Sequence, residues 1–380
     1  MMRALSALTL TSRAMSARAL APELTRTALA PTVTLASGYE MPVVALGTWK
    51  APAGQTGAAV EAAIKAGYRN IDAANDYNNE PEVGAAIKKC IAEGVVTRDE
   101  LFVQCKLWNA NHRPEHVVVD LAQSLEDLQL DYVDSYVIHW PQACPASGLQ
   151  ASTRVDGADA RHYSENPMRF LCSLGYFSSD EGSHYTETWR AMEALVAAGK
   201  CRSIGLSNFN KAQLEEVVAM AKVPVSILQN ECHPYLQQKD LVDVCRTHGV
   251  AFQAFSPLGS GDTNLAVGPS PTGTTPLKDP VVNAIADRAG KDAGQVILKH
   301  AIARGIAVVT KSVTKARVES NFELFDWDLS PEDTKLMDGL NCGWRHLHWR
   351  ETSHHPDYPF RDELPFGYEL EKVSNFAPGQ

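Results

Sequence analysis

From residue 44 onward, short apolar runs alternate with longer segments in which apolar residues recur at helical spacing. The short runs are rich in Val, Ile and Leu, which is typical of strands buried on both faces of a parallel sheet. Eight strands are predicted on this basis, at residues 44–49, 69–74, 101–108, 133–140, 202–208, 226–232, 250–256 and 307–312. Helices are predicted between and after them, at residues 55–66, 81–93, 114–128, 187–198, 211–221, 239–248, 281–289 and 316–324. This alternation indicates parallel strands joined by helices.

Eight strand–helix units predict a closed (β/α)8 barrel, the TIM barrel of the α/β class. The competing architecture is an open doubly wound sheet, which should carry G-x-G-x-x-G after its first strand, and the chain has no such motif. Before the repeat, VTLASGYEMP places a Ser-Gly turn between two short extended pieces. We expect this stretch to form a β-hairpin that plugs the floor of the barrel, and residues 32–380 to form a single barrel domain.

Two segments interrupt the repeat. Residues 141–186 form a long loop after the fourth strand, and loops of that length in compact domains are usually functional or disordered. The piece MRFLCSLGYF within it is apolar, so we expect part of the loop to pack. The tail after Gly343 is rich in Trp, His, Tyr, Phe and Pro and has no helical stripe. We expect this tail to fold over the active-site end of the barrel.

Residues 1–31 differ in composition from the rest of the chain. They carry one acid, Glu23, many Ser, Thr, Ala and Leu, and four basic residues, Arg3, Arg13, Arg18 and Arg26. This composition is typical of an organelle transit peptide, but it also suits a disordered tail without an address. The predicted localisation is therefore cytoplasmic, or mitochondrial or plastid if the segment is a transit peptide.

The charge balance and the cysteines exclude some functions. In 380 residues, 45 acidic against 35 basic side chains give a formal net charge of -10, whereas a general nucleic-acid binder needs a basic face. No uninterrupted apolar run approaches the ~20 residues of a membrane helix. The eight cysteines are scattered without a C-x-x-C pair, and no H-E-x-x-H motif occurs, so neither a disulfide framework nor a metal site is predicted. We expect a monomer that binds a small molecule.

Polar residues gather at the carboxyl ends of the predicted strands, where barrel enzymes carry their catalytic groups. Asp72, Lys106 and His139 lie near the ends of three consecutive strands, and Tyr77 follows in the loop after Asp72. Trp108 and Trp140 end the strands that carry Lys106 and His139. The other strands end with Trp49, Ser207, Asn208, Gln229, Glu231, Phe255, Ser256, Lys311 and Ser312. A lone histidine or lysine is more often structural than catalytic. The coincidence of these residues at one end indicates an active site.

Tyr77, Lys106, Asp72 and His139 together suit the protonation of an oxygen. A tyrosine has a pKa near ~10 in water, and a neighbouring ammonium such as that of Lys106 is expected to lower this pKa. A carboxylate such as Asp72 would keep Lys106 charged, and His139 would hydrogen-bond a substrate oxygen. The set fits an oxygen that gains negative charge when hydride adds to a carbonyl.

Seven stretches of the chain together resemble the aldo-keto reductase family. They are GYRNIDAANDYNNEPEVG, FVQCKLW, VIHWP, GLSNFN, QNECHPYL, FSPLGSG and VVTKSVTKARVESN. The match runs in order from Val44 to Phe360, which is most of the chain, and the combination is specific although each piece alone is not. The resemblance implies a barrel that binds NADPH across the carboxyl ends of its strands and reduces aldehydes and ketones, with aldoses among the candidate substrates.

The resemblance also implies residue roles. Tyr77 would be the general acid, Asp72 and Lys106 would tune its pKa, and His139 would orient the carbonyl. Implied cofactor contacts are Thr48, Trp49, Ser207, Asn208, Gln229, Phe255, Ser256, Leu258, Ser260, Lys311, Ser312, Val313, Thr314, Arg317 and Asn321. Implied walls of the substrate pocket are Trp49, Trp108, His139 and Trp140. The chain departs from the family at Phe255, where a tyrosine usually stacks on the nicotinamide, and at Ser320, where an adenine-binding glutamate is common, although Glu319 is adjacent.

Two cations favour NADPH independently of the resemblance. Lys311 and Arg317 lie six residues apart and are flanked by hydroxyl side chains, at a predicted strand end and helix start. Charges and hydroxyls in this arrangement suit a phosphate monoester such as the adenosine 2′-phosphate. The alternative interpretation is an exposed basic helix turn.

Two other functions remain open from the sequence. The barrel could keep its nucleotide as a sensor and act as a regulatory subunit with little turnover. Lys106 and Lys311 at strand ends would also suit a lyase that forms a Schiff base. A serine hydrolase is excluded, because GLSNF lacks the second glycine of the G-x-S-x-G elbow.

Overall fold

A computed structural model describes residues 30–144, 179–180, 182–260, 270–349 and 352–364. Eight parallel strands close into a barrel in the order β10-β3-β4-β5-β6-β7-β8-β9, which confirms the predicted (β/α)8 fold. The strands are β3 (Val44–Gly47), β4 (Asn70–Asp72), β5 (Phe102–Leu107), β6 (Val133–Ile138), β7 (Cys201–Ser207), β8 (Ile227–Glu231), β9 (Ala251–Phe255) and β10 (Ala307–Thr310). Each of them lies within a few residues of its predicted bounds.

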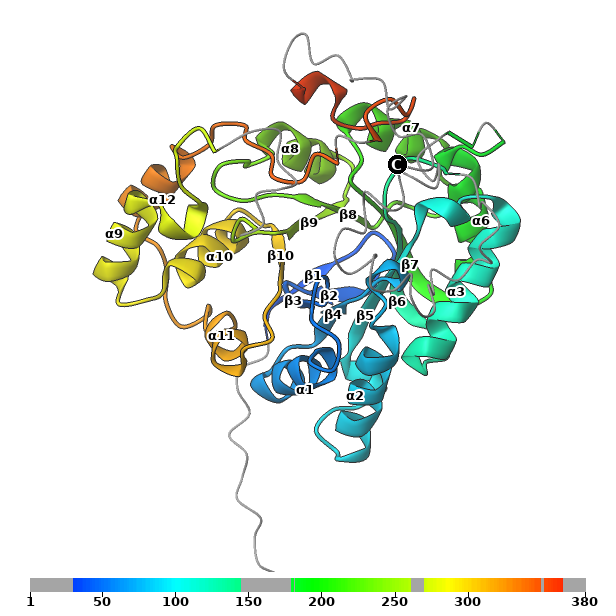
Figure 1. The fold of residues 1–380 in the computed structure, drawn as a ribbon, viewed down its shortest axis with the longest axis horizontal. Coiled ribbons are helices and arrows are strands. Elements are labelled where there is room, and N and C mark those ends of the chain that lie inside the picture. The colour runs from blue at the N-terminus through cyan, green and yellow to red at the C-terminus, as the bar shows by residue number, and fades with distance from the viewer. Residues whose placement is uncertain (1–29, 145–178, 181, 261–269, 350–351, 365–380) are drawn as a thin grey trace, which may run out of the picture.

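Helices surround the barrel (Figure 1). Those that follow the predicted pattern are α1 (Thr56–Ala66), α2 (Glu80–Ala92), α3 (Pro114–Leu128), α6 (Tyr185–Ala197), α7 (Lys211–Met220), α8 (Lys239–Thr247), α9 (Pro280–Ala289) and α11 (Lys315–Ser320). The last of these ends four residues before its predicted end at residue 324. Pro81 lies in the first turn of α2, where its missing N–H costs no helical hydrogen bond.

Two helices, α10 (Ala293–Ala303) and α12 (Pro331–Asp338), were not predicted. α10 packs against β10, and residues 295–301 within it are all buried. Three of these buried residues, Gln295, Lys299 and His300, are polar, so burial in this helix does not follow the pattern of an apolar face opposite a polar one. The local signal is the capping box that Asp292 and Gln295 form at its start.

The predicted hairpin is present and closes the floor of the barrel. β1 (Thr32–Thr34) pairs antiparallel with β2 (Glu40–Pro42). Met41 is buried in a cluster with Phe102, Ile227 and Ala307, which begin three of the barrel strands. Because the hairpin covers the amino ends of the strands, chemistry is left to the carboxyl ends.

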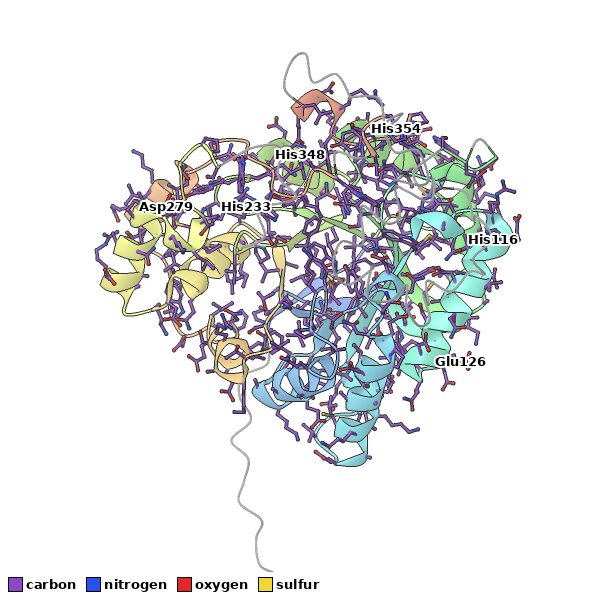
Figure 2. All side chains as sticks on the ribbon, viewed as in Figure 1. His116, Glu126, His233, Asp279, His348 and His354 are labelled. Atoms are coloured by element: carbon purple, nitrogen blue, oxygen red, sulfur yellow. The ribbon has the colours of Figure 1, made fainter. Side chains whose placement is uncertain are left out.

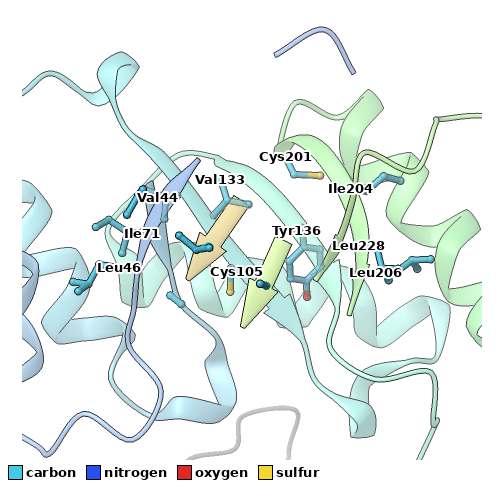
Figure 3. Close-up of a cluster of buried hydrophobic side chains, with 14 of the residues drawn as sticks. Val44, Leu46, Ile71, Cys105, Val133, Tyr136, Cys201, Ile204, Leu206 and Leu228 are labelled. Carbon is cyan, nitrogen blue, oxygen red and sulfur yellow. The ribbon is translucent and has the colours of Figure 1, made fainter. Parts of the chain in front are cut away.

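The main hydrophobic core lies between the barrel strands and the surrounding helices. It contains buried strand residues such as Val44 and Ile71 and buried helix residues such as Val60 and Ile87. Figure 3 shows a cluster of buried side chains, with Val44 and Ile71 among those labelled. Each such side chain contributes about 1.5–3 kcal/mol when fully buried, so the core gives the barrel mouth a rigid support.

The tail lies over the carboxyl end of the barrel, as predicted. The Trp349 ring lies 5.6 Å from that of Trp108 and 4.7 Å from that of Trp140. The backbone N–H groups of His346 and Leu347 donate to the carboxylate of Glu231, at the end of β8, at 2.6 and 2.7 Å. The tail can be followed in Figure 2 by the label of His348.

The long loop after β6 leaves and rejoins the barrel at one point, where the Asp180 N–H donates to the Ala143 carbonyl at 2.9 Å. The stretch MRFLCSLGYF lies outside the described residues, so its packing stays a prediction. Residues 1–29 also lie outside them, and the transit peptide likewise stays a prediction. Among the helices of the described ranges, none has both the length and the apolar character needed to cross a membrane. The same ranges contain no group of three His, Cys, Asp or Glu side chains that could hold a metal ion.

Candidate active site

The structure brings Asp72, Tyr77, Lys106 and His139 together at the carboxyl ends of β4, β5 and β6. Asp72 ends β4, Lys106 lies in β5, His139 follows β6, and Tyr77 ends the short 3-10 helix η1 (Asn75–Tyr77). Lys106 Nζ lies 2.7 Å from Asp72 Oδ1 and 4.9 Å from the centre of the Tyr77 ring. The Tyr77 and His139 rings are 5.7 Å apart at an interplanar angle of 75°.

Thr48 fixes the backbone at the end of β4. Its hydroxyl donates to the Asp72 carbonyl at 2.9 Å, and its own N–H donates to the same oxygen at 3.2 Å. The Asn79 side chain donates to the Thr48 carbonyl at 2.9 Å. The buried Thr48 hydroxyl is therefore engaged within the protein, and the next residue, Trp49, lies partly exposed beside it.

Lys106 and Asp72 form a buried ion pair. The Lys106 side chain is fully buried and also donates to the Ala73 carbonyl at 2.9 Å. A buried charge is costly unless it is paired and hydrogen-bonded, and both conditions are met here. This arrangement holds the ammonium group against the Tyr77 ring.

The pKa of the Tyr77 phenol is raised well above its usual value, which corrects the expectation that Lys106 would lower it. Burial of the hydroxyl group is the largest cause, and the negative charge of Asp72 is the next. The positive charge of Lys106 does not outweigh these effects, because Asp72 pairs with it at 2.7 Å. Tyr77 is therefore a neutral phenol that keeps its proton at neutral pH.

His139 is held neutral by its surroundings. Burial lowers its pKa well below the usual value, and the positive charge of Lys106 lowers it further. A neutral imidazole carries one N–H donor and one acceptor nitrogen. His139 can therefore hydrogen-bond a neutral ligand oxygen without carrying a charge of its own.

Ser207, Asn208 and Gln229 lie together at the ends of β7 and β8. The Ser207 hydroxyl donates to the Gln229 carbonyl at 2.7 Å, and Asn208 Nδ2 donates to the His139 carbonyl at 2.9 Å. Asn208 Oδ1 is buried and has no hydrogen-bond partner among the described residues. Buried acceptors are normally paired, so this oxygen is suited to an amide donor of a ligand.

Positive charge is concentrated beyond the end of β10. It comes from the predicted residues Lys311 and Arg317 and from Lys50, which the sequence did not indicate. Partial burial lowers the pKa of Lys311, and the charges of Arg317 and Lys50 lower it further. Arg317 Nη2 donates to Thr314 Oγ1 at 2.7 Å, and the Thr314 N–H donates to Ser312 Oγ at 3.1 Å. Three cations that repel one another fit an anionic ligand such as a phosphate.

Leu258 and Asn321 face each other across Gly294 of α10. A Cβ added at Gly294 would lie 3.6 Å from Asn321 Oδ1 and 3.7 Å from Leu258 Cδ2. Ser320, which replaces the family's glutamate, donates to Asp292 at 3.0 Å. The other predicted cofactor residues of these segments, Ser256, Ser260 and Val313, follow β9 or β10 as expected.

Glu319, adjacent to Ser320, does not take the place of the missing glutamate in this structure. Its carboxylate is paired with Lys315 of the same helix.

Aromatic side chains line the mouth of the barrel beside His139. Trp108 lies 5.3 Å from the His139 ring, and Trp49 and Phe255 pack against the cluster that contains Trp108 and Trp140. Trp349 of the tail is fully buried in the same cluster and was not assigned to the site from the sequence. Only the fold of the tail shows that Trp349 belongs there, since no motif marks it.

Two buried glutamines near the site, Gln104 and Gln253, were also not assigned to it from the sequence. Gln104 donates to Asp72 and to Gln253, and Gln253 accepts from Gln104 and Gln229, which itself donates to Asp72. Their sequence signal is a glutamine in the middle of an otherwise apolar strand, in FVQCKL and AFQAF.

Glu80 begins α2 and is buried. It accepts a hydrogen bond from Cys105 Sγ at 2.8 Å. Burial raises its pKa to about 7. The hydrogen bond from Cys105 ties the start of α2 to β5, which is a structural role.

An eight-stranded parallel barrel with a buried lysine–aspartate pair, a tyrosine and a histidine at the carboxyl ends of its strands has the architecture of a (β/α)8-barrel enzyme. The model of the Aldo/keto reductase family matches residues 43–341. This chain therefore belongs to the aldo/keto reductase family, whose members use NADP(H).

Known proteins agree with this assignment. The chain is 40% identical over 340 residues to aldo-keto reductase family 1 member A1 of Pongo abelii, covering 87% of this chain and 98% of that protein. Identity to the Homo sapiens protein of the same name is 39% over 340 residues, with the same coverage.

Two solved structures share the fold. The aldose reductase of Schistosoma japonicum matches with a TM-score of 0.75 at 34% identity, covering 88% of this chain and 99% of that one. The Bombyx mori aldo-keto reductase in complex with NADP matches with a TM-score of 0.74 at 35% identity, covering 88% and 100%.

Proposed function

We propose that this protein is an NADPH-dependent reductase that converts aldehydes and ketones, aldoses among them, to alcohols. In reaction class it is an oxidoreductase that acts on CH–OH and carbonyl groups with NADP as acceptor or donor. The observation that carries the proposal is the contact of the Lys106–Asp72 ion pair with the Tyr77 ring, 5.7 Å from the ring of His139.

The residues present fit the cofactor. The cations Lys311 and Arg317, with the hydroxyls of Ser312 and Thr314, would hold the adenosine 2′-phosphate. The unpartnered Asn208 Oδ1, together with Ser207 and Gln229, would hold the nicotinamide carboxamide. The remaining proposed contacts are Thr48, Trp49, Phe255, Ser256, Leu258, Ser260, Val313 and Asn321. When bound, NADPH supplies the hydride for carbonyl reduction.

The side chains around the reacting oxygen have separate tasks. The neutral His139 would hydrogen-bond the carbonyl oxygen and orient it. Tyr77 would donate its phenolic proton to that oxygen as negative charge develops there. The ammonium of Lys106 would stabilise the phenolate that Tyr77 becomes, and Asp72 keeps that ammonium in place.

The aromatic wall would receive the rest of the substrate. Trp49, Trp108 and Trp140 offer apolar faces beside His139, and Trp349 closes this wall from the tail. An aromatic wall of this kind would favour a carbonyl compound with an apolar or aromatic body and would exclude water from the reacting oxygen.

The variant Tyr77→Phe tests the proposal. It removes one hydroxyl and keeps the ring, so NADPH should still bind with an unchanged Kd in a fluorescence titration. Turnover of an aromatic aldehyde such as nitrobenzaldehyde, followed by NADPH oxidation, should fall by about 10²- to 10⁴-fold, the usual contribution of a general acid. Wild-type protein that binds NADPH tightly but oxidises none with a panel of aldehydes and aldoses would instead support a nucleotide-binding regulatory subunit.

We further propose that the protein acts as a monomer, in the cytoplasm or in an organelle if residues 1–31 form a transit peptide. Light scattering of the purified chain and imaging of a fluorescent fusion to residues 1–31 test the two points. A stable dimer would contradict the monomer. A fusion that stays diffuse in the cell would contradict an organelle address in residues 1–31.

A further inference from the structure

A closed hydrogen-bond network lies inside the barrel beneath the candidate site. Gln104 Nε2 donates to Asp72 Oδ1 at 2.8 Å and to Gln253 Oε1 at 3.0 Å. Gln229 Nε2 donates to the same two oxygens, at 2.8 Å each. The network therefore has four corners, with two amide nitrogens that donate and two oxygens that accept.

The network spans the barrel. In the closed order of strands, β4 and β8 are opposite each other, and so are β5 and β9. Asp72 of β4 and Gln229 of β8 are thus joined across the barrel, as are Gln104 of β5 and Gln253 of β9. All four side chains are buried. Barrel interiors are usually filled by branched apolar residues, so two interior glutamines need a reason other than packing.

The direction of each amide follows from the ion pair. Asp72 Oδ1 accepts from Lys106 and can only accept, so Gln104 and Gln229 must turn their N–H groups toward it. Gln253 must then turn its oxygen toward both nitrogens, because a flipped amide would set donor against donor. The reversed orientation of Gln229 would set its oxygen against those of Asp72 and Gln253.

Gln104 keeps this orientation at a cost. Its Oε1 atom is buried and has no hydrogen-bond partner among the described residues. An unpaired buried carbonyl is destabilising, so stability alone would favour an apolar side chain here. The benefit that offsets this cost is the pair of hydrogen bonds that Gln104 donates to Asp72 and Gln253.

We propose that Gln104 and Gln253 are positioning residues, which act by holding Gln229 in one place and one orientation for the nicotinamide end of the cofactor. Both N–H groups of the Gln229 side-chain amide donate inside the barrel. The side chain of Gln229 can therefore offer a ligand only its oxygen, Oε1. The inference rests on the proposed function, because it assigns Gln229 to the cofactor. It goes beyond that function in naming the two residues that fix Gln229 from within the barrel.

The test compares two ligands that differ at the nicotinamide end. NADP+ carries the nicotinamide, whereas 2′-phospho-ADP-ribose lacks it and keeps the adenosine 2′-phosphate. In Gln253→Met, the Kd of NADP+ should rise about five- to tenfold, the equivalent of one hydrogen bond. The Kd of 2′-phospho-ADP-ribose should stay within about twofold, because the phosphate site is unchanged.

The substitutions at positions 104 and 253 should differ in how much they weaken NADP+ binding. Gln104→Met leaves Gln229 with both of its acceptors, so its effect on NADP+ binding should be smaller than that of Gln253→Met. Gln237→Met is the matched control, since Gln237 is an equally buried glutamine that binds the backbone carbonyls of Pro234 and Met337 outside the network. The control should leave the ratio of the two Kd values unchanged.

Each outcome decides the inference. A parallel loss of affinity for both ligands, or no loss for either, would overturn the positioning role and leave the glutamines as structural. If Gln253→Met does not fold, Gln104→Met carries the test through the same ratio, and an unchanged ratio there has the same meaning. Failure of the wild type to bind either ligand would count against the proposed function itself, which keeps the two failures distinct.

Discussion

At the scale of single residues, burial decides the charge state of the groups at the barrel mouth. Burial raises the pKa of Tyr77, lowers that of His139 and lowers that of Lys311, in each case as the largest cause. All three shifts favour the neutral form, as expected when charge is moved out of water. Residue types and spacing in the sequence identified these side chains, but not the direction of the Tyr77 shift, because burial is not visible in the sequence.

The cations beyond β10 carry a residue-scale prediction about the cofactor. Lys311→Met removes one of the charges proposed to hold the 2′-phosphate, so kcat/KM with NADPH should fall about 10- to 100-fold. The value with NADH, which lacks this phosphate, should change by less than about threefold. Lys315→Met is the control, because Lys315 is exposed and paired with Glu319. Equal kcat/KM of the wild type with NADPH and NADH would contradict the prediction.

At the scale of elements, the helices are held against one another by close backbone contacts as well as by apolar side chains. A Cβ added at Gly84 of α2 would lie only 2.3 Å from the Leu128 carbonyl oxygen at the end of α3. Glu82 of α2 caps the start of α1, where it accepts from the N–H groups of Gly54 and Thr56 at 2.8 and 3.0 Å. These contacts set the positions of α1, α2 and α3, and with them the loop that carries Tyr77.

Gly84→Ala should therefore destabilise the protein by about 1–3 kcal/mol or more, because the backbone of α3 must move to make room. Chemical unfolding in urea measures this loss. Gly57→Ala in α1 is the matched control, since its Cβ would meet nothing closer than the Glu82 carbonyl at 3.4 Å. The control should be neutral or slightly stabilising, as alanine favours helix over glycine. Equal stability of the two variants would refute the role of the close contact.

At the scale of the whole molecule, a buried carboxylate at the end of β8 links the start of the tail to the barrel. Glu231 accepts from the N–H groups of His346 and Leu347 and from His233 Nε2, the last at 2.9 Å. Burial by itself would raise the pKa of Glu231, but the hydrogen bond and charge of His233, with the charge of Arg345, lower it to about 2. Through this carboxylate, the end of β8 holds the segment that brings Trp349 to the aromatic wall.

Glu231→Gln should loosen the start of the tail, because a glutamine amide has one acceptor oxygen where the carboxylate offers two. A pKa lowered from 4.5 to about 2 corresponds to roughly 3 kcal/mol of stability at neutral pH. This contribution is complete above pH 4.5 and is lost as the pH falls toward 2. Unfolding in urea should show a large difference between wild type and variant at pH 7 and a smaller one at pH 3.

A loosened tail should also change the KM values of the two substrates to different extents. Loss of the Trp349 contact should raise KM for the carbonyl substrate more than KM for NADPH. Asp243→Asn, which removes an exposed ion pair with Arg246, is the control and should alter neither stability nor KM. A variant with unchanged KM for the carbonyl substrate and a pH-independent loss of stability would contradict the role of Glu231.

The sequence by itself determined the barrel, its strand positions and the residues gathered at its carboxyl ends. It could do so because buried parallel strands and amphipathic helices leave local patterns, and because the ends of barrel strands are a fixed place for polar side chains. Only the tertiary structure decided what depends on contacts between distant segments. Helix α10 buries polar residues such as Lys299 together with its apolar ones, and Trp349 joins the aromatic wall only through the fold of the tail. Gln104 and Gln253 meet only across the closed barrel, and the pKa of Tyr77 follows from burial that no spacing in the chain reveals.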